Sequence, residues 1–188
     1  MEKYHRTFIG LPFRVEQDFL ETLQELKSTL AGERISWVAP ERYHVTLRFL
    51  GDTKESLIGE IGSMLQAGIS IPERTNVELK TLGSFGPRKR PRVLWVGFRE
   101  TDFFELMKTQ VDQALEKCGI LPAEQPFRAH LTLGRVRSLK NLEEYYDTTR
   151  RMAHQFQGSV LFEKLVFFRS VLGPGGPDYQ VLEKIRFR

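Results

Sequence analysis

The sequence predicts an α+β fold in which two mostly antiparallel sheets, related by a pseudo-twofold axis, line a central cleft, with helices on the outside. Three observations support this prediction. Three segments carry apolar residues three or four positions apart, which is the spacing of amphipathic helices, and a fourth helix is indicated more weakly. The segments between them are rich in β-branched and aromatic residues, as strands are. A short motif also occurs twice, and a similar order of elements follows each copy.

The length and composition are those of one ordinary globular domain. The chain has 188 residues, of which 40% are hydrophobic and 28% are charged, so a disordered, collagen-like or coiled-coil chain is excluded. No linker separates the two copies of the motif. We therefore expect residues 1–188 to form a single, monomeric domain made of two interleaved lobes, with one motif in each.

Four helices are predicted, three of them by their apolar stripes and the fourth by a weaker pattern. The first covers residues 15–30, the second follows residues 51–53, the third follows residues 101–102, and the fourth runs from Ser138 into the region of Arg150. The residues expected to face inward in the first three are Val15, Phe19, Leu23, Leu26 and Leu30; Leu57, Ile61 and Leu65; and Phe104, Met107, Val111, Leu115 and Cys118.

Eight strands are predicted around these helices. Residues typical of turns separate them, such as Gly86–Pro87 and the Gly- and Pro-rich run 173–177. The expected strands are residues 6–11, 35–38, 44–50, 76–84, 92–98, 130–136, 159–170 and 179–187.

The repeated motif is Tyr43–Leu47 in the first half of the chain and Ala129–Leu133 in the second. Each copy contains histidine, an apolar residue, threonine and leucine in that order. The interval from the histidine to the last strand of its half is 49 residues in the first half and 51 in the second. This similar spacing supports two related lobes, neither of which can bury its sheet well alone.

Alternation along a strand places the polar residues of each motif on one face. His44 and Thr46 project together, as do His130 and Thr132, while the apolar residues between them point to the core. If the lobes face each other, two imidazoles and two hydroxyls meet in one cleft.

These side chains suit in-line displacement at phosphorus. Imidazole has a pKa of about 6.5, so one ring can take a proton from water or a hydroxyl while the other gives a proton to the leaving oxygen. Hydroxyl groups can hydrogen-bond the non-bridging oxygens, where negative charge accumulates. The sequence therefore predicts His44 and His130 as catalytic residues, and Thr46 and Thr132 as phosphate ligands.

The same histidines are compatible with two different roles. A single histidine in a strand is more often structural or exposed, but the repetition of the whole motif argues against coincidence. A zinc site would also use imidazole, yet neither motif supplies a third ligand, and Cys118 is the only cysteine. We expect neither a metal nor another cofactor.

Positive charge clusters beside aromatic residues. The net charge is +4, and basic residues gather in the run 88–92 and at Arg135, Arg137 and Lys140. The aromatic residues beside them are Phe85, Trp95 and Phe127. This combination favours single-stranded nucleic acid as the partner, although the run 88–92 is equally consistent with a solvated loop.

The roles of two arginines depend on how regular their strands are. Arg135 can bind phosphate only if a bulge or strand end at Gly134 turns it to the face of His130. Arg48 shares the face of His44 if its strand is regular, and it would then contribute positive potential.

Four further residues are assigned to the surface or the core. His5 and His154 lack the complete motif, so we interpret both as surface or structural residues. Tyr179 and Phe13 could stack a base, but an aromatic residue beside a turn or strand end more often packs in the core or its rim.

Other functional signatures are missing from the sequence. Residues 1–6 do not resemble a signal peptide, and no apolar run approaches the roughly 18 residues of a membrane span. Together with the single cysteine, this leads us to expect a cytoplasmic protein that does not contact a membrane. No phosphate-binding loop, dinucleotide fingerprint or nucleophile elbow is present, so nothing indicates use of ATP.

The two motifs and their flanks resemble the 2H phosphoesterase superfamily, specifically its bacterial and archaeal RNA 2′,3′-cyclic phosphodiesterases, also called 2′-5′ RNA ligases. The resemblance covers nearly the whole chain, and both motifs are intact. The segments that carry it are residues 6–12, 37–51, 91–97, 126–136 and 176–182.

The resemblance implies metal-independent hydrolysis of RNA 2′,3′-cyclic phosphate ends to 2′-phosphates on a bilobal fold. By position, His44 would be the general acid that protonates the 3′ oxygen, and His130 the general base that activates water. Thr46 and Thr132 would hold the phosphate oxygens, and Arg135 would assist them. The pseudo-symmetry leaves the two histidines nearly interchangeable by sequence.

Two alternatives stay open. The same residues could join RNA without ATP, with a 5′-hydroxyl replacing water to form a 2′-5′ bond. The basic and aromatic rim could instead bind RNA ends without catalysis, although binding alone would not require paired acid-base groups.

Overall fold

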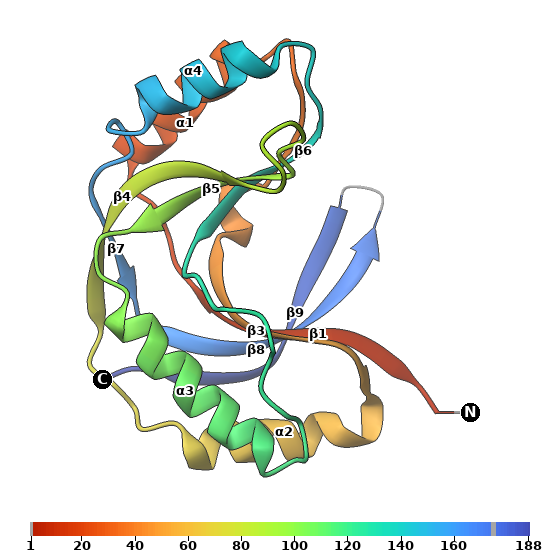
Figure 1. The fold of residues 1–188 in the computed structure, drawn as a ribbon. Coiled ribbons are helices and arrows are strands. Elements are labelled where there is room, and N and C mark those ends of the chain that lie inside the picture. The colour runs from red at the N-terminus through yellow and green to blue at the C-terminus, as the bar shows by residue number, and fades with distance from the viewer. Residues whose placement is uncertain (1, 174–175) are drawn as a thin grey trace.

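A computed structural model describes residues 2–173 and 176–188. Helices are interspersed among the strands, as expected for an α+β protein (Figure 1). In chain order the elements are β1 (Tyr4–Pro12), α1 (Gln17–Thr29), β2 (Arg34–Trp37), a 3₁₀ turn (Pro40–Arg42), β3 (His44–Lys54), α2 (Glu55–Gly68), β4 (Thr75–Phe85), β5 (Val93–Phe98), α3 (Asp102–Glu116), β6 (Leu131–Ser138), α4 (Leu142–Met152), β7 (Ser159–Phe162), β8 (Lys164–Gly173) and β9 (Gly176–Arg186).

The strands form two antiparallel sheets, as the sequence predicts. The first sheet has the order β3-β1-β8-β9 and the second has the order β2-β6-β5-β4-β7. Every pairing within them is antiparallel. The two sheets diverge toward the right of Figure 1.

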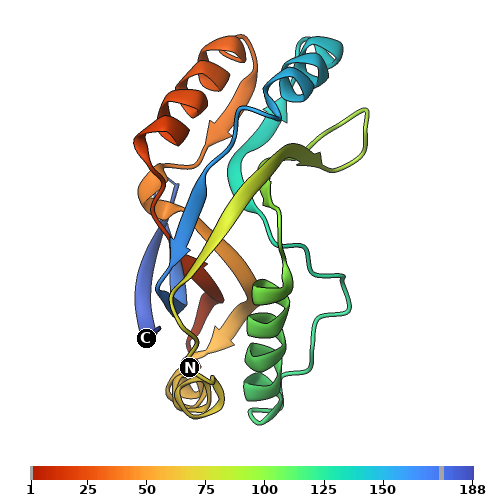
Figure 2. The same ribbon diagram turned by 90° about the vertical axis from the view of Figure 1, so that its left-hand side faces the viewer.

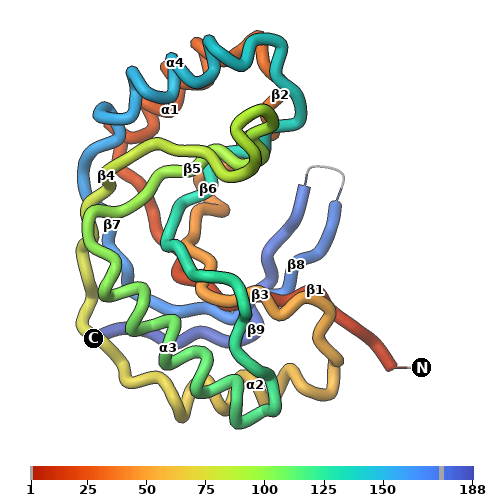
Figure 3. The backbone as a smooth tube through the Cα atoms, viewed as in Figure 1, coloured from red at the N-terminus to blue at the C-terminus, as the bar shows by residue number. Residues whose placement is uncertain are grey.

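Each half of the chain contributes to both sheets. The first motif lies on β3 in the first sheet, but the hairpin that follows, β4–β5, pairs with β6 in the second. The second motif leads into β6, and the later hairpin β8–β9 returns to pair with β1 in the first sheet. Figure 3 shows these crossings, from β3 through α2 into β4 and from β6 through α4 into β7 and β8. The motif of each half is therefore supported by strands of the other half.

The helices cover the outer faces of the sheets. Helices α2 and α3 pack together and against β3, while α4 packs against β4 and contacts α1. Figures 1 and 2 show these two pairs at opposite ends of the molecule, one on each sheet. Their inward residues include those predicted from the apolar stripes, such as Leu23, Ile61 and Met107.

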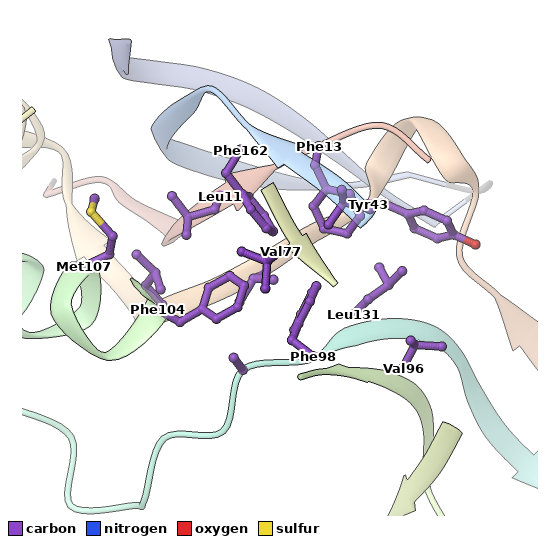
Figure 4. Close-up of a cluster of buried hydrophobic side chains, with 14 of the residues drawn as sticks. Leu11, Phe13, Tyr43, Val77, Val96, Phe98, Phe104, Met107, Leu131 and Phe162 are labelled. Carbon is purple, nitrogen blue, oxygen red and sulfur yellow. The ribbon is translucent and has the colours of Figure 1, made fainter. Parts of the chain in front are cut away.

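One cluster of buried side chains connects the two sheets and their helices. In Figure 4, Leu11 of β1, Phe98 of β5, Phe104 of α3 and Phe162 of β7 meet in this cluster. Phe13 also belongs to it, with its ring centroid 5.1 Å from that of Phe162. The core interpretation of Phe13 is therefore correct, and its possible use as a stacking surface is excluded.

The predicted strand at residues 159–170 was wrong in one respect, because it is two strands in different sheets. Strand β7 ends at Phe162 and pairs with β4, whereas β8 begins at Lys164 and pairs with β1 and β9. The charged residues Glu163 and Lys164 interrupt the apolar run at this point, but they do not show that the following strand joins the other sheet. In the predicted turn 173–177, residues 174 and 175 lie outside the described residues, and Gly173 and Gly176 end β8 and begin β9.

Within the described part of the chain, no helix is both long and apolar enough to cross a lipid bilayer.

Candidate active site

The two motif histidines lie on facing sheets. His44 is the first residue of β3, and His130 directly precedes β6. Both are partly exposed, as are Thr46 and Thr132. The apolar residues that alternate with them are at most 3% exposed, as the sequence predicts: Val45, Leu47, Leu131 and Leu133.

Both imidazoles are oriented by the same hydrogen bond. Nδ1 of His44 lies 2.8 Å from the carbonyl oxygen of Arg42, and Nδ1 of His130 lies 2.8 Å from the carbonyl oxygen of Arg128. A carbonyl oxygen can only accept, so Nδ1 carries the proton and donates it. Nε2 of each ring is therefore the atom available to accept a proton when the ring is neutral, or to donate one when it is charged.

Burial lowers the pKa of both histidines below the usual value for imidazole. For His44, the hydrogen bond to Arg42 opposes this shift, and the charge of His130 adds to it. For His130, the hydrogen bond to Arg128 opposes the shift, and the guanidinium groups of Arg128 and Arg135 add to it. The two rings are thus close enough to interact electrostatically, and their surroundings in the free protein favour the neutral form of both.

Aromatic rings surround His44 on the first sheet. The ring centroids of Phe8 and Tyr179 lie 4.9 and 5.4 Å from that of His44, and the Tyr179 ring is perpendicular to the imidazole. Phe168 stacks on Phe8 at 4.9 Å. Gly10 lies beneath the imidazole, since a Cβ there would be 3.3 Å from Cδ2 of His44.

A second aromatic group lies beside His130 on the other sheet. The ring of Phe85 meets the imidazole edge-on at 4.8 Å and stacks on Trp95 at 4.9 Å. The guanidinium carbon of Arg128 lies 5.9 Å from both ring centroids. Trp95 pairs with Thr132 across β5 and β6, so the indole lies on the same face as the threonine of the motif.

A bulge follows the threonine in both motifs. On β3, Leu47 has no partner in β1, although Thr46 and Arg48 on either side of it do. On β6, Leu133 likewise has no partner in β5, although Thr132 and Gly134 do. A bulge shifts every later side chain to the opposite face. The fourth residue after each histidine therefore points inward and the fifth points to the face of the imidazoles.

The expected bulge at Gly134 is present, and it turns Arg135 toward His130. The charge of Arg135 lowers the pKa of His130 and opposes the rise that burial causes in the pKa of Tyr179. Arg6 and Arg42 act on Tyr179 in the same direction. Arg135 thus acts on both His130 and Tyr179, which lie on different sheets.

The expected position of Arg48 was wrong, and the equivalent bulge on β3 is the physical reason. Arg48 is 8% exposed and points away from His44 toward α3. Its Nη1 lies 3.7 Å from Oδ1 of Asp112, and its Nη2 donates to the carbonyl oxygen of Leu121. Phe49, the next residue, takes the site-facing position and is 65% exposed.

The sequence matches the LigT-like phosphoesterase family over residues 9–95 and 101–179, which include both histidine motifs. The chain belongs to this family. An RNA 2′,3′-cyclic phosphodiesterase of Aeropyrum pernix is 34% identical over 167 residues, covering 87% of this chain and 94% of the relative. A protein of Aquifex aeolicus with the same name is 32% identical over 97% of both chains.

Solved structures share the fold of this LigT-like phosphoesterase. A Thermus thermophilus protein superposes with a TM-score of 0.78 at 23% identity, covering 97% of this chain and 98% of the other. Apo LigT of E. coli superposes with a TM-score of 0.73 at 18% identity, covering 98% of each chain. The α+β arrangement with two antiparallel sheets is therefore that of LigT-like structures.

Sequence reasoning missed several residues at this candidate site. Phe8 and Phe168 resemble ordinary core residues of strands, and Arg128 lies outside the repeated motif. One signal was available for Arg128, because an arginine precedes the histidine by two positions in both halves, at Arg42 and Arg128. No comparable signal marks Phe8 or Phe168, since strand pairing alone brings them to His44.

The remaining histidines lie apart from the two motifs. His5 on β1 contacts Oε1 of Glu55 through Nε2 at 3.1 Å, and His154 lines an outer groove beside β4 and β7. Tyr179 packs on His44 at the rim, which agrees with the rim interpretation. Across residues 2–173 and 176–188, no three His, Cys, Asp or Glu side chains gather as a metal site would require.

Proposed function

We propose that this protein hydrolyses RNA 2′,3′-cyclic phosphate ends to 2′-phosphomonoesters by metal-independent general acid and base catalysis. The observation that carries the proposal is the matched pair of imidazoles, each with Nδ1 held by a backbone carbonyl and Nε2 available for proton transfer. The curated relatives named RNA 2′,3′-cyclic phosphodiesterases support the choice of substrate.

His130 acts as the base and His44 as the acid. Nε2 of neutral His130 takes a proton from water while the water oxygen forms a bond to phosphorus. The bond between phosphorus and the 3′ oxygen breaks, and Nε2 of charged His44 gives that oxygen its proton. The products are a 2′-phosphate and a 3′-hydroxyl, and the histidines have exchanged protonation states.

Thr46, Thr132 and Arg135 bind the phosphate. The hydroxyls donate hydrogen bonds to the non-bridging oxygens, and the guanidinium group of Arg135 offsets the charge that develops on them. The cyclic phosphate is an anion, so its arrival favours a charged imidazole and raises the low pKa of His44 in the complex.

The decisive experiment is hydrolysis of an oligonucleotide with a 2′,3′-cyclic phosphate end in excess chelator, with the position of the product phosphate identified. We expect a 2′-phosphate from the native protein and a loss of about 10²- to 10⁴-fold for His44→Ala or His130→Ala. His5→Ala is the matched control, because that ring pairs with Glu55 outside the site, and it should retain full turnover.

Two results would overturn the proposal. Full turnover by His130→Ala would exclude the two-histidine mechanism, and loss of activity with chelator would exclude metal independence. Tight, salt-dependent binding of the RNA end without turnover would instead identify a noncatalytic binding protein.

A further inference from the structure

The exposure of two neighbouring residues on β3 is the reverse of what their chemistry favours. Arg48 is 8% exposed, and its Nε has no hydrogen-bond partner in the described part of the chain. Phe49, by contrast, is 65% exposed. Burial of a cation and exposure of a large apolar ring both cost free energy. Unbroken alternation from His44 would bury the ring and expose the cation instead, so the observed arrangement is not the one that stability alone favours.

Two interruptions of the strand pairing place Phe49 on the face of the imidazoles. Leu47 on one side of it and Leu50 on the other have no partner in β1, whereas Phe49 itself is paired with Phe8. Extra residues of this kind are common beside active sites, where they redirect a side chain. Sequences depart from local rules of burial mainly where function requires it. The exposed ring therefore indicates a function rather than packing.

The position of Phe49 is a binding position in the other motif. Phe49 is the fifth residue after His44, and Arg135 is the fifth residue after His130. An equivalent interruption turns both toward the imidazoles, and Arg135 is the residue that we assign to the phosphate. An aromatic ring in the equivalent place suits a flat, apolar part of the substrate. The part of RNA with that chemistry is a nucleobase.

The aromatic rings of the first sheet lie at two distances from the imidazole. Tyr179 contacts the ring of His44 directly, with the centroids 5.4 Å apart. Phe49 lies 5.9 Å from Phe8, which in turn lies 4.9 Å from His44. Among the described residues, no ring contact joins Phe49 to His44 itself. Phe49 is thus further from the imidazole than Tyr179, with the ring of Phe8 touching both Phe49 and His44.

A cation lies on the same face beside these rings. Arg6 precedes Phe8 by two positions on β1, and Thr7 between them is 1% exposed, so Arg6 and Phe8 project to the same side. Burial raises the pKa of Tyr179, and the charge of Arg6 is one of those that oppose the rise. Arg6 belongs to none of the ion pairs formed within residues 2–173 and 176–188. Its charge is therefore available to an anion of the substrate.

We propose that Phe49 stacks the second-last base of the RNA and that Arg6 binds the phosphate joining the last two nucleosides. This inference rests on the proposed function, in which His44 protonates the 3′ oxygen. That oxygen belongs to the terminal nucleoside, which therefore lies beside His44 with Tyr179 as the nearest ring for its base. The preceding nucleoside lies one step further away, where Phe49 is.

This site gives the protein a preference for oligonucleotides over single nucleoside cyclic phosphates. Neither hydrolysis nor joining of a cyclic phosphate requires it, because the bond that breaks lies within the terminal nucleotide. A stacked base and a phosphate bound by a cation are the two interactions that bind single strands. Packing against Phe8 holds the ring of Phe49 before the substrate arrives, which reduces the entropy lost on binding.

The test compares two substrates that differ by one nucleotide. They are adenosine 2′,3′-cyclic phosphate and the dinucleotide ApA with the same cyclic end, and the length ratio is kcat/KM for the dinucleotide divided by kcat/KM for the nucleoside. We expect a length ratio well above one for the native protein. Phe49→Ala should lower it about 5- to 150-fold, which is the loss expected for one stacked base, and leave the nucleoside reaction unchanged. Phe49→Tyr keeps the ring and should keep the ratio.

A modified substrate tests the stacking without any change to the protein. A dinucleotide whose first nucleoside lacks its base should react with the native protein as slowly as ApA reacts with Phe49→Ala. With Phe49→Ala, the dinucleotides with and without this base should react equally fast.

Val181→Ala is the matched control. Val181 is paired with Phe168 in the same row across the first sheet, and it is 58% exposed on the opposite edge strand, β9. Its length ratio should equal that of the native protein. A loss in Val181→Ala in place of Phe49→Ala would put the second base at the other edge and contradict the assignment.

Arg6→Gln tests the phosphate contact. Only the dinucleotide carries a second phosphate, so this variant should lower the length ratio about 2- to 5-fold, as for an exposed ion pair. The native length ratio should also fall with added salt, and that of Arg6→Gln should fall less.

A native length ratio near one, or an unchanged ratio in Phe49→Ala, would overturn this site while turnover of both substrates still supports the proposed function. Loss of the nucleoside reaction in a folded Phe49→Ala variant would place the terminal base on Phe49 and overturn the assignment to the second base. Absence of turnover of either substrate by the native protein would instead overturn the proposed function itself.

Discussion

The ring of Tyr179 stands perpendicular to the imidazole of His44, with the two centroids 5.4 Å apart. Tyr179 comes from β9, near the end of the chain, and His44 begins β3. The C-terminal hairpin thus completes the surroundings of a residue in the first half of the chain, and changes in this hairpin should alter catalysis.

Replacement of Tyr179 by leucine should lower kcat/KM about 2- to 12-fold, because an aromatic pair contributes about 0.5–1.5 kcal/mol. Tyr179→Phe keeps the ring and should retain most of the activity. Steady-state kinetics on a cyclic-phosphate oligonucleotide measure both variants. An equal loss in the two would show that the hydroxyl matters rather than the ring.

Gly10→Ala should disturb the first motif directly. Its Cβ would lie 2.9 Å from the carbonyl oxygen of Val45 and 3.3 Å from Cδ2 of His44, so we expect the free energy of unfolding to fall by about 1–3 kcal/mol and kcat/KM to fall with it. Urea unfolding and kinetics provide the measurements.

Gly59→Ala is the control for this change. Gly59 lies within α2, and a Cβ there would meet no atom within 4 Å. The free energy of unfolding should rise by up to about 1 kcal/mol, because alanine favours the helix. If Gly10→Ala matched Gly59→Ala in stability and activity, the close approach at His44 would have no consequence.

The dependence of kcat/KM on pH should be bell-shaped, with its maximum below about pH 6.5. Burial lowers the pKa of both histidines in the free protein. The acid loses its proton as the pH rises past its lowered pKa, and the base becomes charged as the pH falls below its own. The bell therefore lies on the acid side of the usual imidazole pKa.

The maximum of kcat should lie at higher pH than that of kcat/KM, because the bound anion favours charged imidazole. Initial rates from pH 4.5 to 8.5 at low and saturating substrate give the two profiles. A value of kcat/KM that rose steadily to pH 8 would contradict the lowered pKa values.

Arg48 should matter for stability rather than for catalysis. Arg48→Met removes the ion pair with Asp112, which keeps only Lys108, and leaves the carbonyl oxygen of Leu121 without the hydrogen bond that Arg48 donates. We expect the free energy of unfolding to fall by about 1–3 kcal/mol, with kcat/KM of the folded protein unchanged.

Arg99→Met provides the comparison for Arg48, since Arg99 forms an exposed pair with Glu78 and should contribute less than about 1 kcal/mol. Urea unfolding measures both. A loss of activity without a loss of stability in Arg48→Met would place Arg48 at the site after all.

The sequence by itself determined the local chemistry of this protein. Alternation along a strand correctly separates His44 and Thr46 from Val45, because neighbouring residues of a strand face opposite sides whatever the strand pairs with. Three of the helices follow from their apolar stripes for the same local reason. The repetition of the motif then indicated two related halves and an acid-base pair.

Only the tertiary structure decided which face of the strand is taken by the side chains that follow Thr46 and Thr132. The bulges at Leu47 and Leu133 arise from pairing with β1 and β5, strands distant in sequence, and they bury Arg48 while they turn Arg135 toward the histidines. Pairing between distant strands likewise brings Phe8 and Tyr179 to His44, and it divides the predicted strand 159–170 between two sheets at Glu163. The register of a strand depends on which strand it pairs with, and the local pattern of a single sequence does not identify that partner.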